Sequence, residues 1–440
     1  MAATLPATAA CAEVGGQMLA LVAELFPICR SITGDGLRQT LRRIGREIPL
    51  EIHEVPSGTR AFDWTVPKEW NIRDAYVRNA RGERVIDFQA SNLHVLNYSV
   101  PVRRRMTLAE LRPHLYTVPE QPDWVPYRTS YYEERWGFCL AHRDLVALPA
   151  GEYDVCIDAT LADGHLSYGE CYLPGERRDE VLISCHCCHP SLANDNLSGI
   201  AVATELARRL ADAPLRHSYR FLFIPGTIGS LVWLATHEAG ASRIRHGLVL
   251  SCLGDGGAFT YKQSRRGDAP IDRAAAHVLG HAGAAARIVQ FSPYGYDERQ
   301  YCSPGFDLPV GRLTRTPNGE YPEYHTSADD LGLVQPASLA ESLAACLEIV
   351  EILEQDRRYV SLNPKGEPQL GRRGLYGSVG GRVAPKETEA ALLWVLSLSD
   401  GRHGLLDIAE RAALPFAVVQ QAAEALHTHG LLRPESKGEG

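Results

Sequence analysis

Residues 181–199 constrain the fold of this chain more than any other stretch. Val181 opens a short apolar run that continues into small residues, a composition typical of a strand buried on both faces of a parallel sheet. Pro190 ends this strand, a polar loop with Asp195 follows, and the Ala-rich segment 200–210 has a helical pattern. Open α/β sheets place ligands outside the carboxyl ends of their strands. The polar loop therefore lies where a binding site is expected.

Three residues of this stretch are candidate metal ligands. His186 and His189 are three residues apart at the end of the predicted strand, and Asp195 follows inside an Asn-Asp-Asn sequence. Imidazole nitrogen and carboxylate oxygen are the usual non-thiolate ligands of zinc. An alternative interpretation makes the two histidines core residues and Asp195 a cap of the following helix. Cys187 and Cys188 are alternative soft metal ligands, but at least two of Cys185, Cys187 and Cys188 are interpreted as apolar filler.

Composition indicates a soluble globular protein of two or three domains. The chain has 440 residues, of which 45% are hydrophobic and 22% charged, and a formal net charge of -8. That charge gives no reason to expect a nucleic-acid partner. The 11 cysteines form no recognisable disulfide framework, which favours a reducing compartment. We find neither a signal peptide nor a long apolar run, and we expect a cytoplasmic protein without a membrane partner.

Strand and helix patterns alternate along residues 160–362. This alternation predicts an α/β fold with a mixed, mostly parallel sheet covered by helices, to which residues 1–60 add two helices and a strand. A strand from residue 285 is expected to run antiparallel, and residues 308–311 are expected to form a short edge. Residues 61–159 are rich in tryptophan, tyrosine and proline and predict a small inserted β-rich domain.

Residues 363–440 outline a winged-helix domain. Three short helices are expected at 386–398, 404–412 and 415–428. The third contains no Lys or Arg, and residues 386–435 hold four basic against seven acidic side chains. We therefore expect no nucleic-acid binding here, and a packing role or a homo-oligomer interface is favoured.

A second group of polar side chains occurs late in the α/β region. Residues 292–305 and 320–329 both follow predicted strands, so both can overhang the same sheet edge as His186. His325 is a structural residue by one interpretation. By the other, it adds a further imidazole to the metal site.

The segments HPSLANDNLSG and EYHTSAD resemble the metal-binding segments of M28-type zinc aminopeptidases. Nearly the whole chain is similar to a bacterial family of M28-like proteins described as aminopeptidase-like or associated with polysaccharide biosynthesis. That family has an inserted β-rich domain and a C-terminal winged helix. The resemblance implies a zinc-exopeptidase-like fold with His186, Asp195 and His325 as zinc ligands. It makes Asp195 the bridging group if two ions bind, and His189 is a candidate family-specific ligand.

The chain departs from the M28 pattern at two places. M28 enzymes carry a Glu-Glu pair after the second strand of the domain, whereas residues 223–230 of this chain contain no carboxylate. A further ligand Asp is expected after the next strand, where this chain has Ser251-Cys252-Leu253-Gly254, with Asp255 slightly later. We therefore expect one zinc ion rather than two.

The candidate metal ligands and the resemblance to M28 enzymes together predict an aminopeptidase-like, zinc-dependent hydrolase of a peptide or other amide bond. Its expected substrate is a small peptide or amide. Glu298 is the predicted general base, with Glu323 and Asp255 as other candidates. In an alternative interpretation Glu298 forms an internal ion pair with Arg299. Arg299 is otherwise expected to clamp a substrate carboxylate, and Tyr324 to donate to an oxyanion. Two other functions stay open: a deacylase of an amino sugar or biosynthetic intermediate, and a non-catalytic zinc-stabilised scaffold.

Overall fold

A computed structural model gives the fold, and it describes residues 8–282, 285–375 and 386–435. The chain divides into two compact units. The larger unit comprises residues 3–269 and 285–344, and the smaller one comprises residues 270–284 and 345–440. Among the described helices, none is both long and apolar enough to cross a membrane.

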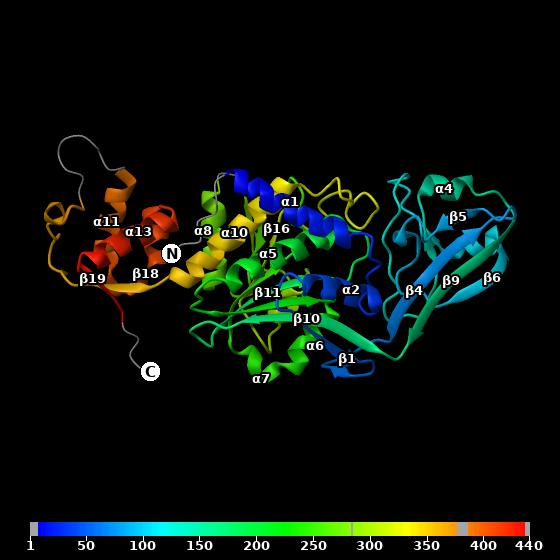
Figure 1. The fold of residues 1–440 in the computed structure, drawn as a ribbon, viewed down its shortest axis with the longest axis horizontal. Coiled ribbons are helices and arrows are strands. Elements are labelled where there is room, and N and C mark those ends of the chain that lie inside the picture. The colour runs from blue at the N-terminus through cyan, green and yellow to red at the C-terminus, as the bar shows by residue number, and fades with distance from the viewer. Residues whose placement is uncertain (1–7, 283–284, 376–385, 436–440) are drawn as a thin grey trace. The chain divides into compact units, whose positions relative to one another are not determined.

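The larger unit is built on a mixed eight-stranded sheet (Figure 1). In spatial order its strands are β1 (Glu51–Pro56), β10 (His165–Leu173), β12 (Ser218–Ile224), β11 (Glu180–His186), β13 (Ile244–Leu250), β16 (Val310–Thr314), β14 (Thr260–Lys262) and β15 (Arg287–Val289). The central strands β12, β11, β13 and β16 run parallel to one another. The predicted α/β class with a mostly parallel sheet is confirmed.

The far end of this sheet differs in part from the prediction. The strand expected from residue 285 is β15, and it runs antiparallel to the central strands because it is parallel to β14, which opposes β16. The expected edge at residues 308–311 is wrong, since β16 lies inside the sheet between β13 and β14. β14 has only three residues, too few to give a recognisable hydrophobic period.

Helices cover both faces of the sheet. The helices of the larger unit are α1 (Thr8–Leu25), α2 (Asp35–Ile44), α5 (Gly199–Ala211), α6 (Ile228–Thr236), α7 (Glu238–Ala241), α9 (Glu298–Tyr301) and the first part of α10 (Pro336–Gln355). In Figure 1, α1 and α5 lie above the sheet and α6 and α7 below it. Every residue of β11 and β12 is buried, as two-sided cover requires.

The inserted segment forms a second, antiparallel sheet. Its strands in spatial order are β5 (Arg84–Asp87), β4 (Glu69–Arg78), β9 (Glu152–Ala162) and β6 (Val102–Thr107). Shorter elements accompany it: β2 (Arg60–Ala61), β3 (Trp64–Thr65), α3 (Leu108–Leu111), β7 (Leu115–Tyr116), β8 (Phe138–Cys139) and α4 (His142–Ala147). The hydrophobic core is continuous from Trp70 and Phe138 of this segment to Leu182 of β11. The insertion is therefore packed into the larger unit.

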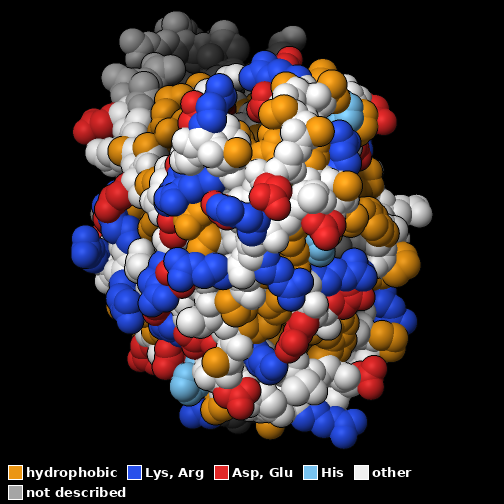
Figure 2. All heavy atoms as spheres, turned by 90° about the vertical axis from the view of Figure 1, so that its right-hand side faces the viewer, with side chains coloured by type: hydrophobic (Ala, Val, Ile, Leu, Met, Phe, Trp, Pro, Cys, Tyr) orange, Lys and Arg blue, Asp and Glu red, His pale blue; other side chains and the backbone are white. Residues whose placement is uncertain are grey.

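The outer face of the inserted sheet carries charges of both signs (Figure 2). Arg73 lies 2.7 Å from Asp158, and Arg105 lies 2.8 Å from Asp154. These pairs are largely exposed and contribute little to stability. The arrangement is that of a solvated mixed-charge surface.

The smaller unit contains the winged helix. Its elements are α8 (Pro270–His281), the end of α10, β17 (Arg358–Ser361), α11 (Lys386–Leu398), β18 (Asp400–Gly404), α12 (Leu405–Ala412), α13 (Phe416–Thr428) and β19 (Leu432–Pro434). The three predicted helices are confirmed. β17 pairs with β18 and β19, so this sheet begins before residue 363, where the sequence pattern placed the domain boundary.

Shortening Leu182 to Ala tests how much the central strand contributes to stability. Leu182 is fully buried on β11, and its truncation leaves a cavity that we expect to lower the free energy of unfolding by about 2–5 kcal/mol. Urea unfolding followed by tryptophan fluorescence measures the change. Leu331→Ala is the control, because Leu331 is 36% exposed and its loss should cost about 0.5 kcal/mol or less. Equal effects of the two changes would contradict the assignment of β11 to the core.

Candidate metal centre

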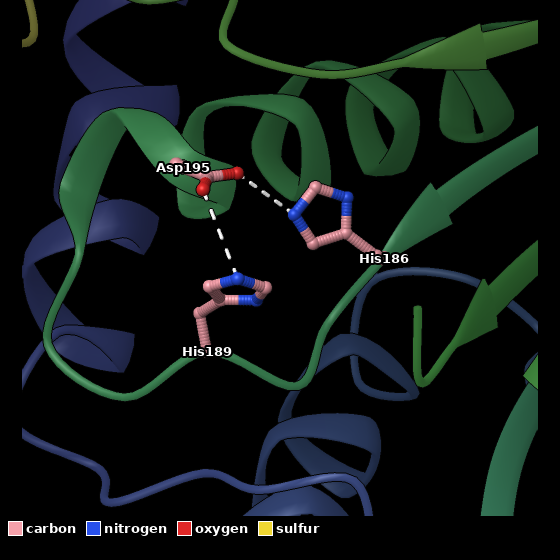
Figure 3. Close-up of side chains that lie close together, drawn as sticks. All are labelled: His186, His189 and Asp195. Atoms are coloured by element: carbon pink, nitrogen blue, oxygen red, sulfur yellow. Dashed lines mark hydrogen bonds and ion pairs between the residues drawn. The ribbon is translucent and has the colours of Figure 1, made fainter. Parts of the chain in front are cut away.

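Three imidazoles converge on the carboxylate of Asp195. The Nε2 atom of His186 lies 2.8 Å from Asp195 Oδ1, and the Nε2 atom of His325 lies 3.0 Å from Oδ2. His189 approaches the same Oδ2 with its Nε2 at 3.8 Å. Figure 3 shows His186 and His189 pointing toward Asp195 from two sides. The four predicted metal ligands are thus brought together, although 130 residues separate Asp195 from His325.

Each of these side chains lies at the end of a buried strand or in a loop that follows one. His186 is the last residue of β11, and Asp195 lies in the turn η3 (Ala193–Ser198) that leads into α5. His325 lies in the loop that follows β16, with a backbone φ of 55°. Because β11 and β16 belong to one parallel set, their carboxyl ends meet at the same sheet edge. The topology explains how two distant loops form one site.

The backbone of the Asp195 loop is fixed by a second carboxylate. Asp329 accepts hydrogen bonds from the backbone N–H groups of Asn194, at 2.6 Å, and Asp195, at 3.0 Å. Burial raises the pKa of Asp329 to about 7. The Asn194 side chain in turn donates to Asp255 at 2.9 Å. Asp329 ends the segment EYHTSAD, so its place in that segment was the available signal for its role.

The protonation states match what a metal site requires. Burial would raise the pKa of Asp195, but His189 and His186 lower it well below its usual value, so the carboxylate is charged. Burial lowers the pKa of His189 well below its ordinary value, so its ring is neutral. Metal ligands must be deprotonated carboxylates and neutral imidazoles.

The donor set fits zinc. One ligand atom from each of His186, His189 and Asp195 lies within 4.8 Å of the others. The Nδ1 atom of His189 faces the Cys188 thiol at 3.5 Å, which directs its Nε2 to the Asp195 side. Three imidazoles and one carboxylate match the nitrogen and oxygen ligands that zinc takes in proteins.

Glu298, the predicted general base, lies in a buried ion pair. Lys262 Nζ is 2.9 Å from its Oε1, and the backbone N–H of Tyr296 donates to Oε2 at 3.0 Å. Burial raises the pKa of Glu298, but Arg312 and Lys262 lower it, and its pKa falls below the usual value. This arrangement favours the alternative of an internal ion pair, although the cation beside Glu298 is Lys262 rather than Arg299. Asp255 is occupied as well, by Asn194 and Thr316.

Arg299 and Tyr324 have different surroundings. The Nε atom of Arg299 is buried and has no hydrogen-bond partner among the described residues. Tyr324 stacks on His325 with ring centroids 3.9 Å apart and an interplanar angle of 14°. Tyr324 therefore orients a candidate ligand.

Asp297 is a buried carboxylate that the sequence analysis passed over. Its Oδ1 accepts hydrogen bonds from the Thr227 backbone, at 2.7 Å, and from the Ser230 hydroxyl, at 2.9 Å, where α6 begins. Its Oδ2 is buried without a hydrogen-bond partner in the described part of the chain. Burial raises the pKa of Asp297 to about 6, although the nearby charge of His186 opposes the rise. Its position beside Glu298 in the sequence was the only signal for it.

The inserted domain contributes directly to the centre. The backbone N–H of Tyr127 donates to the carbonyl of His325 at 2.7 Å. The Tyr127 ring lies 5.1 Å from the His189 ring and 5.0 Å from the His325 ring. Val125 and Ser327 exchange two further hydrogen bonds, of 2.8 and 3.0 Å. The insertion thus holds the loop that carries His325.

Arg30 holds the backbone of the His189 loop in place. Its guanidinium donates to the backbone carbonyls of His189 at 2.6 Å, Pro190 at 2.9 Å and Leu25 at 2.6 Å. The side chain is 1% exposed, and burial lowers its pKa to about 10. A buried charge that bonds only to backbone carbonyls fixes the path of that backbone.

Comparison with known proteins identifies relatives over the whole chain. Residues 19–356 match the family described as "Domain of unknown function (DUF4910)", and residues 357–434 match a winged helix-turn-helix family. A Clostridium acetobutylicum protein named "Putative polysaccharide biosynthesis protein with aminopeptidase-like domain" is 51% identical over 421 residues, 96% of this chain and 97% of the relative. The crystal structure of a "putative peptidase" from Clostridium acetobutylicum is 49% identical, covers 97% of each chain and has a TM-score of 0.93.

More distant structures share the fold. BSAP, a zinc aminopeptidase from Bacillus subtilis, has a TM-score of 0.58 at 13% identity, covering 79% of this chain and 96% of its own. A peptidase M28 precursor from Shewanella amazonensis has a TM-score of 0.53 at 12% identity, covering 78% and 96%. The larger unit therefore has the fold of the M28 zinc aminopeptidases.

Replacing Arg30 by Ala tests its role in fixing the His189 loop. The change leaves three buried carbonyls without their donor, and we expect the free energy of unfolding to fall by at least about 2 kcal/mol. Urea unfolding measures this loss. Arg143→Ala is the control, because Arg143 is 64% exposed and pairs with Asp123 at the surface. Unchanged stability in Arg30→Ala would show that the loop keeps its path without this side chain.

Proposed function

The chain belongs to the DUF4910 family, joined to a C-terminal winged helix, and we propose that it is a zinc-dependent hydrolase of a peptide or other amide bond. The observation that carries this proposal is the convergence of His186, His189 and His325 on the buried carboxylate of Asp195. The M28 aminopeptidase fold supports it, as does the aminopeptidase-like domain in the name of the 51% identical relative. We assign one zinc ion to this cluster, with Asp195 as its central ligand.

The chemistry divides between the ion and the protein. Zinc held by these ligands would polarise the scissile carbonyl and lower the pKa of a bound water to about 7. The chain must then accept a proton from the attacking water and return one to the leaving amine. Asp297 is the better candidate for this transfer, because its Oδ2 has no partner among the described residues and its pKa is about 6. Glu298 would first have to leave Lys262.

Two further side chains are assigned to the substrate. Arg299 has an unused Nε donor, as a clamp for a substrate carboxylate requires. Tyr324 stacks on His325, a proposed ligand, and is the candidate donor to the oxyanion that would form at the carbonyl.

A second candidate function is deacylation of an amino sugar. It is favoured by the relative's description as a polysaccharide biosynthesis protein and by the absence of a carboxylate from residues 223–230, where M28 peptidases carry their Glu pair. Hydrolysis of N-acyl amino sugars but not of aminoacyl amides would establish it. Bound zinc without hydrolysis of either class would instead indicate the non-catalytic scaffold.

Asp195→Asn tests the proposed hydrolase. The amide loses the negative charge on which the three imidazoles converge, so we expect bound zinc to disappear and hydrolysis to fall by at least about a hundredfold. Elemental analysis of the purified protein and turnover of an aminoacyl amide panel measure the two effects. A chelator should reproduce both losses in the unaltered protein, and added zinc should reverse them.

Asp330→Asn is the matched control, since Asp330 is exposed and lies on the same segment as Asp329. It should keep both zinc and turnover. Undiminished turnover in metal-free protein would refute the proposal.

A further inference from the structure

The thiol of Cys252 lies beside the Oδ1 side of the Asp195 carboxylate. Its Sγ is 3.9 Å from Asp195 Oδ1, the oxygen that also faces His186 at 2.8 Å. Cys252 is fully buried and follows β13, the strand next to β11. His325 and His189 approach the other oxygen, Oδ2. The carboxylate therefore has an imidazole and a thiol on one side and two imidazoles on the other.

The backbone holds this thiol in an unusual conformation. Cys252 has a φ of 50°, which is uncommon for a residue with a side chain. Its N–H donates to the side-chain oxygen of Asn196 at 3.1 Å, and its carbonyl accepts from the backbone of Arg315 at 2.9 Å. Because Asn196 directly follows Asp195, the loop that positions the carboxylate also positions the thiol.

Polar groups surround the sulfur, which as a thiol donates to Asp195 Oδ1 at 3.9 Å and to Asn318 Oδ1 at 3.7 Å. The Ser251 hydroxyl donates to it at 3.5 Å, and the Tyr321 hydroxyl lies at 3.8 Å. Burial raises the pKa of Cys252 well above its ordinary value, so without a cation the group stays a neutral thiol. A coordinated metal ion reverses this preference and deprotonates the thiol outright.

We propose that Cys252 is a thiolate ligand of the ion held by His186 and Asp195 Oδ1. The inference rests on the proposed zinc function. With His186, Asp195 and Cys252 as its protein ligands and one position left for water, Zn–S and Zn–O bonds of usual length would place sulfur and oxygen about 3.6 Å apart, close to the 3.9 Å observed here. On binding, the thiol S–H bond breaks, a sulfur–zinc bond forms, and the proton leaves to solvent. A soft ligand selects zinc over magnesium or manganese.

Cobalt(II) substitution tests the assignment without relying on activity. A thiolate bound to cobalt gives an intense charge-transfer band in the near ultraviolet, which imidazole and carboxylate ligands do not give. We expect this band in the cobalt-loaded protein, and we expect its loss in both Cys252→Ser and Cys252→Ala. Zinc affinity, measured by chelator competition, should fall at least about tenfold in both variants.

Two matched variants control for nearby and distant thiols. Cys188→Ser removes the sulfur beside His189, and Cys171→Ser removes a buried sulfur on β10. Both should keep the band. A band lost in Cys188→Ser but kept in Cys252→Ser would overturn the assignment, as would bound cobalt without a band in the unaltered protein. Failure of the unaltered protein to bind either metal would overturn the proposed function as well, so the two failures are distinguishable.

Discussion

The buried negative charge of Asp195 is the constraint on which the rest of the site depends. A carboxylate taken out of water costs several kcal/mol unless it is paired, and among the described residues the groups beside its two oxygens that can balance the charge are imidazoles, at 2.8 to 3.8 Å. Three separate segments must meet to supply them: the end of β11, the loop after it and the loop after β16. A divalent ion bound by the same side chains would also balance the negative charge of Asp195.

Much of the remaining structure holds these segments in place. Arg30 fixes the backbone at His189 from the N-terminal segment, and Asp329 fixes the backbone at Asp195 from the loop that also carries His325. Tyr127 fixes His325 from the inserted domain. The insertion is therefore part of the centre, which agrees with the hydrophobic core that it shares with the main sheet.

The chain keeps the M28 fold while the groups at the candidate metal centre differ from the M28 pattern. The M28 pattern has a Glu pair after the second strand, whereas the segment of this chain that begins α6 contains no carboxylate. Asp297, which lies in a different loop, accepts hydrogen bonds from the Thr227 backbone and the Ser230 hydroxyl at the start of α6. Where the pattern has an Asp after the next strand, the thiol of Cys252 lies beside Asp195. Each difference alters the charge near the candidate metal centre within the same fold. The same fold can therefore surround its site with a different set of charged groups.

The sequence by itself determined the buried strand β11, the polar loop after it, the helix α5, the alternation that produces a parallel sheet, and the three helices of the winged domain. These are local properties, because hydrophobic period and turn residues act over a few positions. It also indicated His186, His189, Asp195 and His325, since their residue types and the topology of parallel strands restrict where they can lie.

Only the tertiary structure decided which charges meet. Lys262 rather than Arg299 is the cation beside Glu298, and Asp297, Cys252 and Tyr127 surround the centre from three other segments. Such contacts depend on strand order and on loop paths that span between 36 and 70 residues of sequence, and no local pattern specifies them.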